Sequence, residues 1–201
     1  MSWLPRTGCQ FPPAPECGQR CAIQSGALWK YVKEEDTYRC PTGDKEWIVT
    51  YAIVDSMNGK YQWTKGDGTT DPKGISLCLK NLNQIPRPSD RIVFVDEGHM
   101  SPDSYAVYSG LFNGSVTGAQ RWYDPPMNRH GGGTIVSYAD GHSARWMWKS
   151  KYTTDPARQC EYSQPVPATD RAACNDLYKM QIAAWGKIGY TPSFPPNVTP
   201  E

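Results

Sequence analysis

Residues 129–146 read RHGGGTIVSYADGHSARW, and this stretch determines how we interpret the rest of the chain. Its segment 134–139 is rich in β-branched and aromatic residues, as is typical of a half-buried strand. The dipeptide Asp140-Gly141 follows it, and a second strand-like run, SARWMW, begins at Ser143. Because glycine tolerates the positive φ angle of a tight turn, the sequence predicts a β-hairpin here.

Two further apolar runs predict the other strands of a sheet. Residues 47–54 (WIVTYAIV) have almost no polar break, and residues 91–96 (RIVFVD) form the second run. Asn58-Gly59, after the first run, predicts another hairpin. We therefore expect an α+β fold in which an antiparallel β-sheet is surrounded by short helices and long loops.

Helical patterns occur on both sides of these strands. Residues 26–35 (GALWKYVKEE) predict a short amphipathic helix with Leu28, Trp29 and Val32 on one face. A second helix is predicted to begin after Thr169 or Asp170 and to continue to about residue 185. Its residues at core spacing are Ala173, Leu177, Met180 and Ala184.

The composition predicts a single globular domain over residues 1–201, because no repeat and no change of composition divides the chain. We expect an irregular lead-in rich in Cys and Pro at 1–25, a core at 26–148, and an extension with one helix and a Pro-rich tail at 149–201. Eight Trp and twelve Tyr supply much of the apolar area. The net charge is +1 and the basic residues are scattered, which argues against a nucleic-acid partner.

Four sequence blocks occur in an order that a known group of proteins shares. They are Gly26–Trp29 with Tyr38-Arg39-Cys40-Pro41, then Ile92–Asp96 with Glu97, then Arg129-His130, and finally Asp140-Gly141-His142 with Trp146 or Trp148. This pattern resembles the H-X9-DG domain of bacterial proteins that have prepilin-type N-termini. The resemblance covers residues 29–148.

The resemblance implies the soluble head of a type IV pilin-like or type II secretion pseudopilin-like protein, a structural or assembly subunit and not an enzyme. Such proteins begin with a basic leader, a cleavage site and a long apolar helix, and we find none of these at the start of this chain. We therefore expect a head that lacks its N-terminal helix and meets the membrane only through that helix. The implied partners are other pilin-like subunits or the secretion or pilus machinery, and the implied location is exported, periplasmic or extracellular.

Seven cysteines in a chain of this size favour disulfides in an oxidising compartment. We expect a Cys160–Cys174 disulfide around a Pro-rich segment, and Cys78 as a buried free thiol. Two disulfides are expected among four N-terminal cysteines whose pairing stays open: Cys9, Cys17, Cys21 and Cys40. Zinc ligation is the alternative, because the spacing of Cys17 and Cys21 suits half of a zinc site.

The hairpin also offers ligands for a metal. His130, Asp140 and His142 supply two imidazoles and a carboxylate, a set that first-row metals accept, and the ligands Asp96 and Glu97 could complete it. No cofactor is required, but a structural ion is an option: calcium, which pseudopilins often hold, or zinc or manganese if imidazole takes part. We favour the simpler alternative, in which His130 hydrogen-bonds to Asp140 or to backbone and fixes the register of the hairpin.

Enzymatic function has less support in the sequence. There is no G-x-S-x-G nucleophile motif and no phosphate-binding loop, and Asp96 and Glu97 should face opposite sides of their strand. A metal-dependent enzyme that uses His130, Asp140 and His142 remains an alternative.

An exported carbohydrate-binding module is the other alternative. Trp63, Trp122 and Tyr123 lie near polar, glycine-rich loops and could stack on the sugars of a polysaccharide. The competing explanation is that these aromatic side chains belong to the core.

Overall fold

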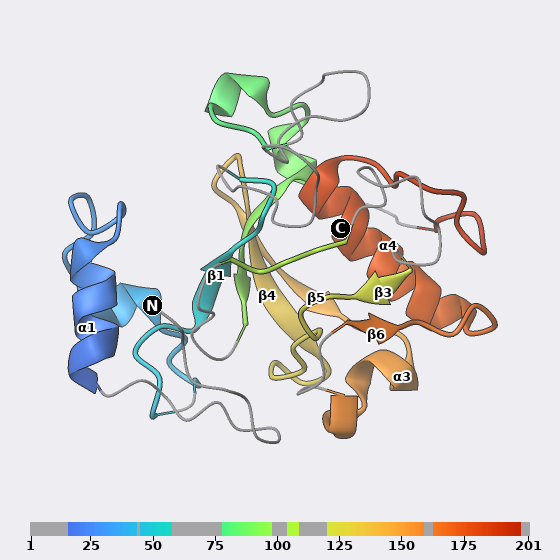
Figure 1. The fold of residues 1–201 in the computed structure, drawn as a ribbon, viewed down its shortest axis with the longest axis horizontal. Coiled ribbons are helices and arrows are strands. Elements are labelled where there is room, and N and C mark those ends of the chain that lie inside the picture. The colour runs from blue at the N-terminus through green and yellow to red at the C-terminus, as the bar shows by residue number, and fades with distance from the viewer. Residues whose placement is uncertain are drawn as a thin grey trace.

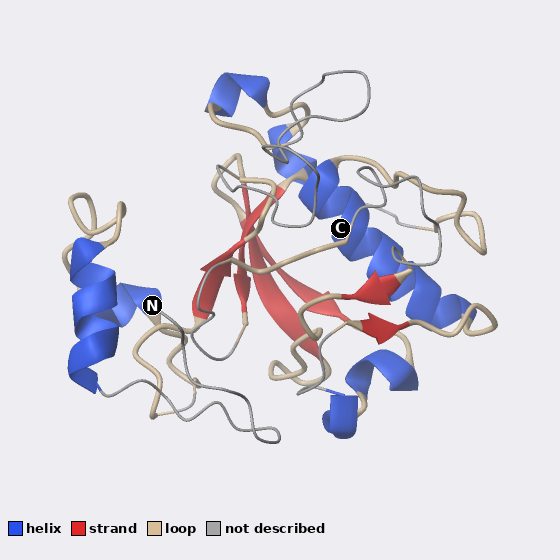
Figure 2. Cartoon of the chain, viewed as in Figure 1, coloured by secondary structure: helices blue, strands red, loops and turns tan. Residues whose placement is uncertain are grey.

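The computed structural model describes residues 16–43, 45–57, 78–97, 104–108, 120–158 and 163–197. A four-stranded antiparallel sheet with the order β1-β2-β4-β5 lies at its centre (Figure 1 and Figure 2). The strands are β1 (Tyr51–Ile53), β2 (Ile92–Asp96), β4 (Gly133–Tyr138) and β5 (Ser143–Met147). The predicted α+β class with an antiparallel sheet is confirmed.

Strands β4 and β5 form the hairpin that the sequence predicted. Their register pairs Thr134 with Trp146 and Ser137 with Ser143, and Gly141 in the turn has a φ of +97°. Gly133 begins β4 directly against the backbone of Trp146, where a Cβ atom would overlap the Trp146 carbonyl oxygen. Glycine is therefore required at both places, once for its conformation and once for its size.

Helix α4 (Arg171–Trp185) packs beside this sheet (Figure 1). The side chain of Asp170 accepts a hydrogen bond from the backbone N–H of Ala173 at 2.9 Å, and Gly186 ends the helix with a φ of 80°. The four positions predicted at core spacing are all fully buried: Ala173, Leu177, Met180 and Ala184. This helix and its buried face are confirmed.

Two buried charged side chains connect α4 to the rest of the domain. Arg91, just before β2, donates from Nε and Nη2 to the carbonyl oxygens of Ala183 and Ala184 at 3.2 and 2.6 Å. Asp176 accepts hydrogen bonds from the backbone N–H groups of Lys149 and Ser150, each at 3.0 Å. The last turn of α4 and the segment after β5 are thus held by hydrogen bonds as well as by apolar packing.

The N-terminal part of the chain differs from the prediction. Helix α1 (Glu16–Ser25) lies where an irregular lead-in was expected, and the helix expected at 26–35 is replaced by turns and by η1 (Glu35–Tyr38). The helix ends before Gly26, in keeping with the preference of glycine for helix C-termini. Buried Gln19 holds α1 in place, since it donates to the carbonyl of Glu46 at 3.0 Å and accepts from the N–H of Ile48 at 2.8 Å.

The remaining elements are short. A second sheet pairs β3 (Arg121–Trp122) with β6 (Gln164–Pro165), and the small helices are η2 (Leu82–Gln84), η3 (Pro88–Asp90), α3 (Lys151–Thr154) and η4 (Pro156–Arg158). The first predicted strand is shorter than its apolar run, because residues 47–50 precede the β-ladder. The hairpin predicted at Asn58-Gly59 lies outside the described residues. In the described ranges, no helix combines the length and the apolar character needed to cross a bilayer.

Candidate functional site

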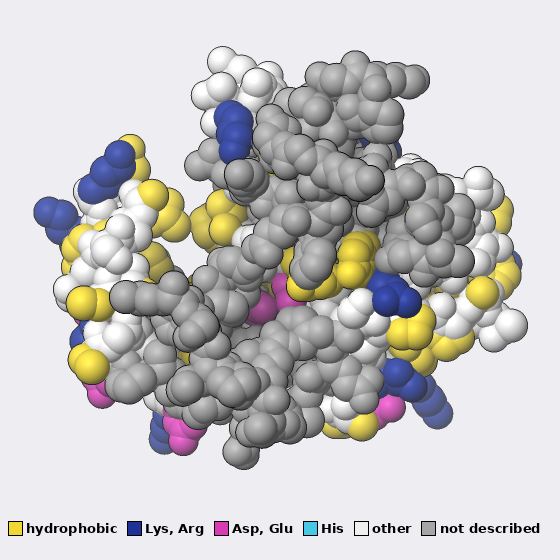
Figure 3. All heavy atoms as spheres, in the orientation of Figure 1, with side chains coloured by type: hydrophobic (Ala, Val, Ile, Leu, Met, Phe, Trp, Pro, Cys, Tyr) yellow, Lys and Arg dark blue, Asp and Glu magenta, His cyan; other side chains and the backbone are white. Residues whose placement is uncertain are grey.

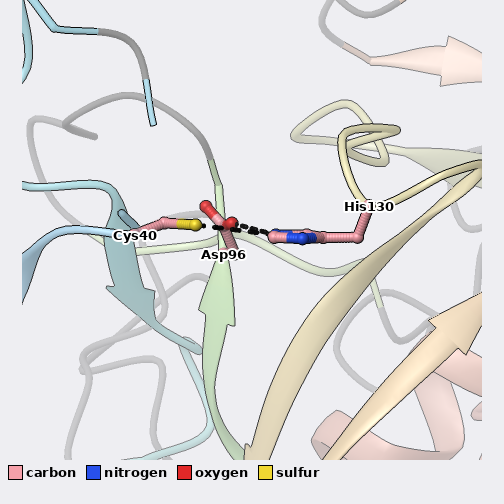
Figure 4. Close-up of side chains that lie close together, drawn as sticks. All are labelled: Cys40, Asp96 and His130. Carbon is pink, nitrogen blue, oxygen red and sulfur yellow. Dashed lines mark hydrogen bonds and ion pairs between the residues drawn. The ribbon is translucent and has the colours of Figure 1, made fainter. Parts of the chain in front are cut away.

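Three side chains with metal-ligating atoms meet at one end of the central sheet. Among the residues that the structure describes, Cys40, Asp96 and His130 are the group whose ligand atoms all lie within 4.8 Å of one another (Figure 4). Cys40 follows η1, Asp96 is the last residue of β2, and His130 lies in the loop that enters β4. The site is therefore assembled from three segments that are distant in sequence.

Hydrogen bonds to the backbone of each of these residues help to position the three side chains. The N–H of Cys40 donates to the hydroxyl of Thr50 at 2.7 Å, and the hydroxyl of Thr134 donates to the carbonyl of Asp96 at 2.9 Å. The N–H of His130 donates to the carbonyl of Gly133 at 3.2 Å, which closes a tight turn. Gly131 and Gly132 within this turn have φ angles of 67° and 99°, a conformation that side chains disfavour.

The contacts in the cluster all involve the same imidazole nitrogen. Nε2 of His130 lies 2.6 Å from Oδ2 of Asp96 and 3.8 Å from Sγ of Cys40. Asp96 and Cys40 are buried, at 1% and 4% exposure, while the side chain of His130 is 18% exposed. The buried carboxylate is further balanced by Arg129, whose Nη2 lies 3.7 Å from Oδ2.

Tyr51 adds a phenol beside the sulfur. Burial, and after it the neighbouring Cys40 and Asp96 groups, raises the pKa of Tyr51 to about 12. Its hydroxyl is therefore protonated at neutral pH and available as a hydrogen-bond donor.

This geometry does not suit a proton relay of the Cys-His-Asp kind. In such a relay the nucleophile and the carboxylate bind different nitrogens of the imidazole. Here the sulfur and the carboxylate both lie nearest to Nε2, so they converge on a common point. Convergence of three donor atoms on one point is the arrangement that a metal ion requires.

The structure separates the histidines that the sequence grouped together. Nδ1 of His142 lies 2.5 Å from Oδ1 of Asp140 in the exposed turn between β4 and β5, and the His142 ring stacks on Tyr138. His130 lies at the opposite end of the six-residue strand β4, about 20 Å away along the chain. The prediction of one site from His130, Asp140 and His142 is therefore wrong, as is a hydrogen bond between His130 and Asp140, because an extended strand holds its two ends apart.

Asp96 and Glu97, the two acidic residues at the end of β2, lie in different surroundings. Asp96 enters the cluster, whereas Glu97 is fully buried beside Tyr105, whose pKa is raised by burial and by the charges of Asp124 and Glu97. Neighbouring residues of a strand face opposite sides, as the sequence predicted. Glu97 does not belong to the cluster that contains Asp96, so the prediction of Glu97 as a metal ligand beside Asp96 is wrong.

Cys40 was missed as a site residue because the sequence grouped it with the disulfide cysteines. Cys40 is not disulfide-bonded, and neither are Cys17 and Cys21, which lie exposed on α1. The prediction of two disulfides among the N-terminal cysteines is therefore wrong. The signal that could have identified Cys40 is its place in the block Tyr38-Arg39-Cys40-Pro41. Cys174 is also a free thiol, buried in α4, so the predicted Cys160–Cys174 disulfide is wrong. Cys9 and Cys160 lie outside the described residues.

The aromatic residues proposed for sugar binding are not assembled on the described surface. Trp122 is 2% exposed and packs edge-on against Trp148 at 5.6 Å, so its ring offers no face to a sugar. Tyr123 is half-buried against Tyr108 at 5.2 Å. Trp63 lies outside the described residues. The prediction for Trp122 is therefore wrong, because the indole is part of the core.

A mainly apolar groove lies on the sheet beside the cluster. Its volume is about 490 Å³, and Figure 3 shows a hollow beside the N-terminal segment. The apolar and aromatic residues that line it include Leu28, Val32, Tyr38, Tyr51, Phe94 and Ile135. Because Tyr51 belongs both to this lining and to the surroundings of Cys40, the groove and the cluster are neighbours.

No protein-family model matches the chain, and no curated protein or solved structure matches it at significant similarity.

Proposed function

We propose that this chain is the exported head of a pilin-like or pseudopilin-like subunit, with a structural role in assembly. The observation that carries the proposal is the apolar groove on the central sheet. In the proteins that the sequence resembles, a long apolar helix precedes the head. The groove is where we expect such a helix to pack.

The composition of the groove favours an apolar occupant. On the side formed by the turns after α1, Leu28 is 45% exposed and Val32 is 36% exposed, while residues of β1, β2 and β4 line its floor. Removing such side chains from water stabilises a complex by up to about 1.5–3 kcal/mol for each side chain that becomes fully buried. None of the described residues that line the groove is charged, so these residues offer no partner to a charged ligand.

The positions of the sequence blocks also support the proposal. Cys40, Asp96 and His130 come from three different blocks of the resemblance, and they lie in contact at one end of the sheet. These three residues of the pattern therefore connect the η1 segment, β2 and the loop before β4. Other pilin-like subunits or the secretion or pilus machinery are the partners that we propose.

The two alternatives have less support from the described residues. A carbohydrate-binding module would use Trp122, which is buried, and a metal-dependent enzyme would use His130 and His142, which lie at opposite ends of β4. Polysaccharide is still compatible with an exported head and is kept as a proposed ligand of the assembled protein.

The first test is the reading frame upstream of the codon for Met1. The proposal expects a basic leader, a prepilin cleavage site and an apolar helix there. An ordinary secretory signal would overturn it and favour a free exported binding module.

The second test measures the groove directly. The apolar segment found upstream would be synthesised as a fluorescent peptide and titrated with the protein in mild detergent. Leu28→Arg places a charge in the groove and should weaken binding at least about tenfold, since a buried unpaired charge costs several kcal/mol. The matched control is Leu82→Arg, because Leu82 is 62% exposed on η2 and does not line the groove. Equal affinity of both variants would contradict the proposal.

A further inference from the structure

We infer that Cys40, Asp96 and His130 form a binding site for a transition-metal ion of the zinc class. The inference does not depend on the occupant of the groove. It also replaces the ligand set that the sequence predicted, because Cys40 enters and Asp140 and His142 leave.

The chemical types of the three ligand atoms determine which metal the site would prefer. One thiolate, one imidazole and one carboxylate are ligands that zinc accepts in tetrahedral sites. Calcium and magnesium instead take oxygen ligands, six or more in the case of calcium, so a sulfur and a nitrogen in a three-residue set disfavour both ions. The ligand set therefore fits a metal of the zinc class. It does not fit calcium, the ion that the family resemblance implied.

The sulfur–nitrogen separation is close to that of a tetrahedral zinc site. Standard zinc–sulfur and zinc–nitrogen bonds place the two ligand atoms about 3.6 Å apart. Sγ of Cys40 and Nε2 of His130 are 3.8 Å apart. Oδ2 of Asp96 lies 2.6 Å from Nε2 and would have to move back by about 0.7 Å to make room for an ion.

Burial and charge favour a bound cation over the metal-free arrangement. Cys40 and Asp96 are both nearly fully buried, and as ligands they would supply two negative charges to a divalent ion. Without a metal, Arg129 and His130 balance the negative charge of Asp96 through contacts of 3.7 and 2.6 Å. That ion-pair cluster gives no reason for a thiol to face the same nitrogen, whereas a metal site does.

The surroundings also supply partners for the ligands. The hydroxyl of Thr42 lies 3.2 Å from Sγ of Cys40 and can donate to a thiolate. His130 is the most exposed member of the cluster, so water can reach a fourth coordination position on its side. A metal bound here would tie the segment after η1, the end of β2 and the loop into β4 to one another.

Cobalt titration of the full chain tests the site. Cys17→Ser and Cys21→Ser are introduced first, because these exposed thiols could bind metal themselves. The expected result is one Co²⁺ per chain with a thiolate-to-cobalt charge-transfer band in the near ultraviolet, which Zn²⁺ then abolishes by displacement. Zn²⁺ at a hundredfold excess over its Kd should raise Tm by about 5–10 °C, and Ca²⁺ should not.

Variants assign the band to these residues. Cys40→Ser should abolish the charge-transfer band, and His130→Gln or Asp96→Asn should weaken binding by roughly 100-fold or more. The matched controls are His142→Gln and Asp140→Asn, which alter the same two residue types at the other end of the hairpin and should bind as the parent does. Near-ultraviolet circular dichroism establishes that each variant is folded. Absence of the band in the parent protein, or its persistence in Cys40→Ser, would overturn the inference, and the parent result decides even if a variant does not fold.

Discussion

Nε2 of His130 lies 2.6 Å from Oδ2 of Asp96 and thereby joins the loop before β4 to the end of β2. A second pair of the same chemistry, His142 and Asp140, has a contact of 2.5 Å in an exposed turn. The two pairs differ mainly in burial. Exposed ion pairs contribute little to stability, whereas the loss of one partner from a buried pair leaves a charge without compensation.

Replacement of His130 should therefore destabilise the metal-free protein. For His130→Ala we expect a loss of about 2–4 kcal/mol, since Arg129 still balances part of the Asp96 charge. This corresponds to a fall in Tm of roughly 5–10 °C, measured by thermal unfolding with a chelator present. His142→Ala is the control and should leave Tm unchanged. A similar loss in both variants would show that burial of the first pair has no energetic consequence.

Arg91 should stabilise the end of α4 through its two hydrogen bonds. Arg91→Lys keeps the charge but removes the planar fork that reaches the carbonyls of Ala183 and Ala184, so we expect a loss of about 1–2 kcal/mol in urea unfolding. Arg87→Lys is the matched control, because the Arg87 side chain is 71% exposed and forms a surface ion pair with Asp90. Hydrogen exchange of the last turn of α4 should increase in the first variant alone, and unchanged exchange there would contradict the assigned role.

Substitutions of Gly133 and Gly141 should destabilise the hairpin by different amounts. Gly133→Ala places a Cβ into the carbonyl oxygen of Trp146, and relief requires a backbone shift that we expect to cost more than about 3 kcal/mol. Gly141→Ala meets open space but retains a φ of +97°, which should cost only about 1–2 kcal/mol. Urea unfolding measures both. The reverse order would mean that turn conformation, and not close strand approach, limits the hairpin.

The buried carboxyl group of Asp176 should make the stability of the protein depend on pH. Burial raises the pKa of Asp176 above its ordinary value of 3.8, despite the hydrogen bonds from Lys149 and Ser150. The folded state then holds this proton more tightly than the unfolded chain, so the contribution of Asp176 is full below pH 3.8 and is lost as the pH rises through the folded pKa. The free energy of unfolding of the parent minus that of Asp176→Asn should fall as the pH rises from below 3.8 toward neutrality. A difference that grows with pH would show that the hydrogen bonds outweigh burial.

Much of the sheet and α4 could be predicted because their signals are local. Alternation in 134–139, the Asp140-Gly141 turn and the Asp170 cap of α4 each act within a few residues, and the structure has each element at that place. The N-terminal helix was misplaced for a different reason. Its position depends on Gln19, whose side chain hydrogen-bonds to residues 46 and 48, and such a contact leaves no periodic pattern.

The candidate site also combines features that follow from local sequence with contacts that depend on the tertiary structure. Strand periodicity indicated that Asp96 and Glu97 face opposite sides, yet the predicted metal site included both, and the structure brings only Asp96 to Cys40 and His130. The meeting of Cys40 with His130 joins residues 90 positions apart, and it depends on how η1, β2 and the loop before β4 pack together. The distance between His130 and His142 depends in turn on β4 being extended. Short-range order follows from backbone sterics and side-chain alternation, whereas contacts between distant segments are fixed by the packing of the whole core.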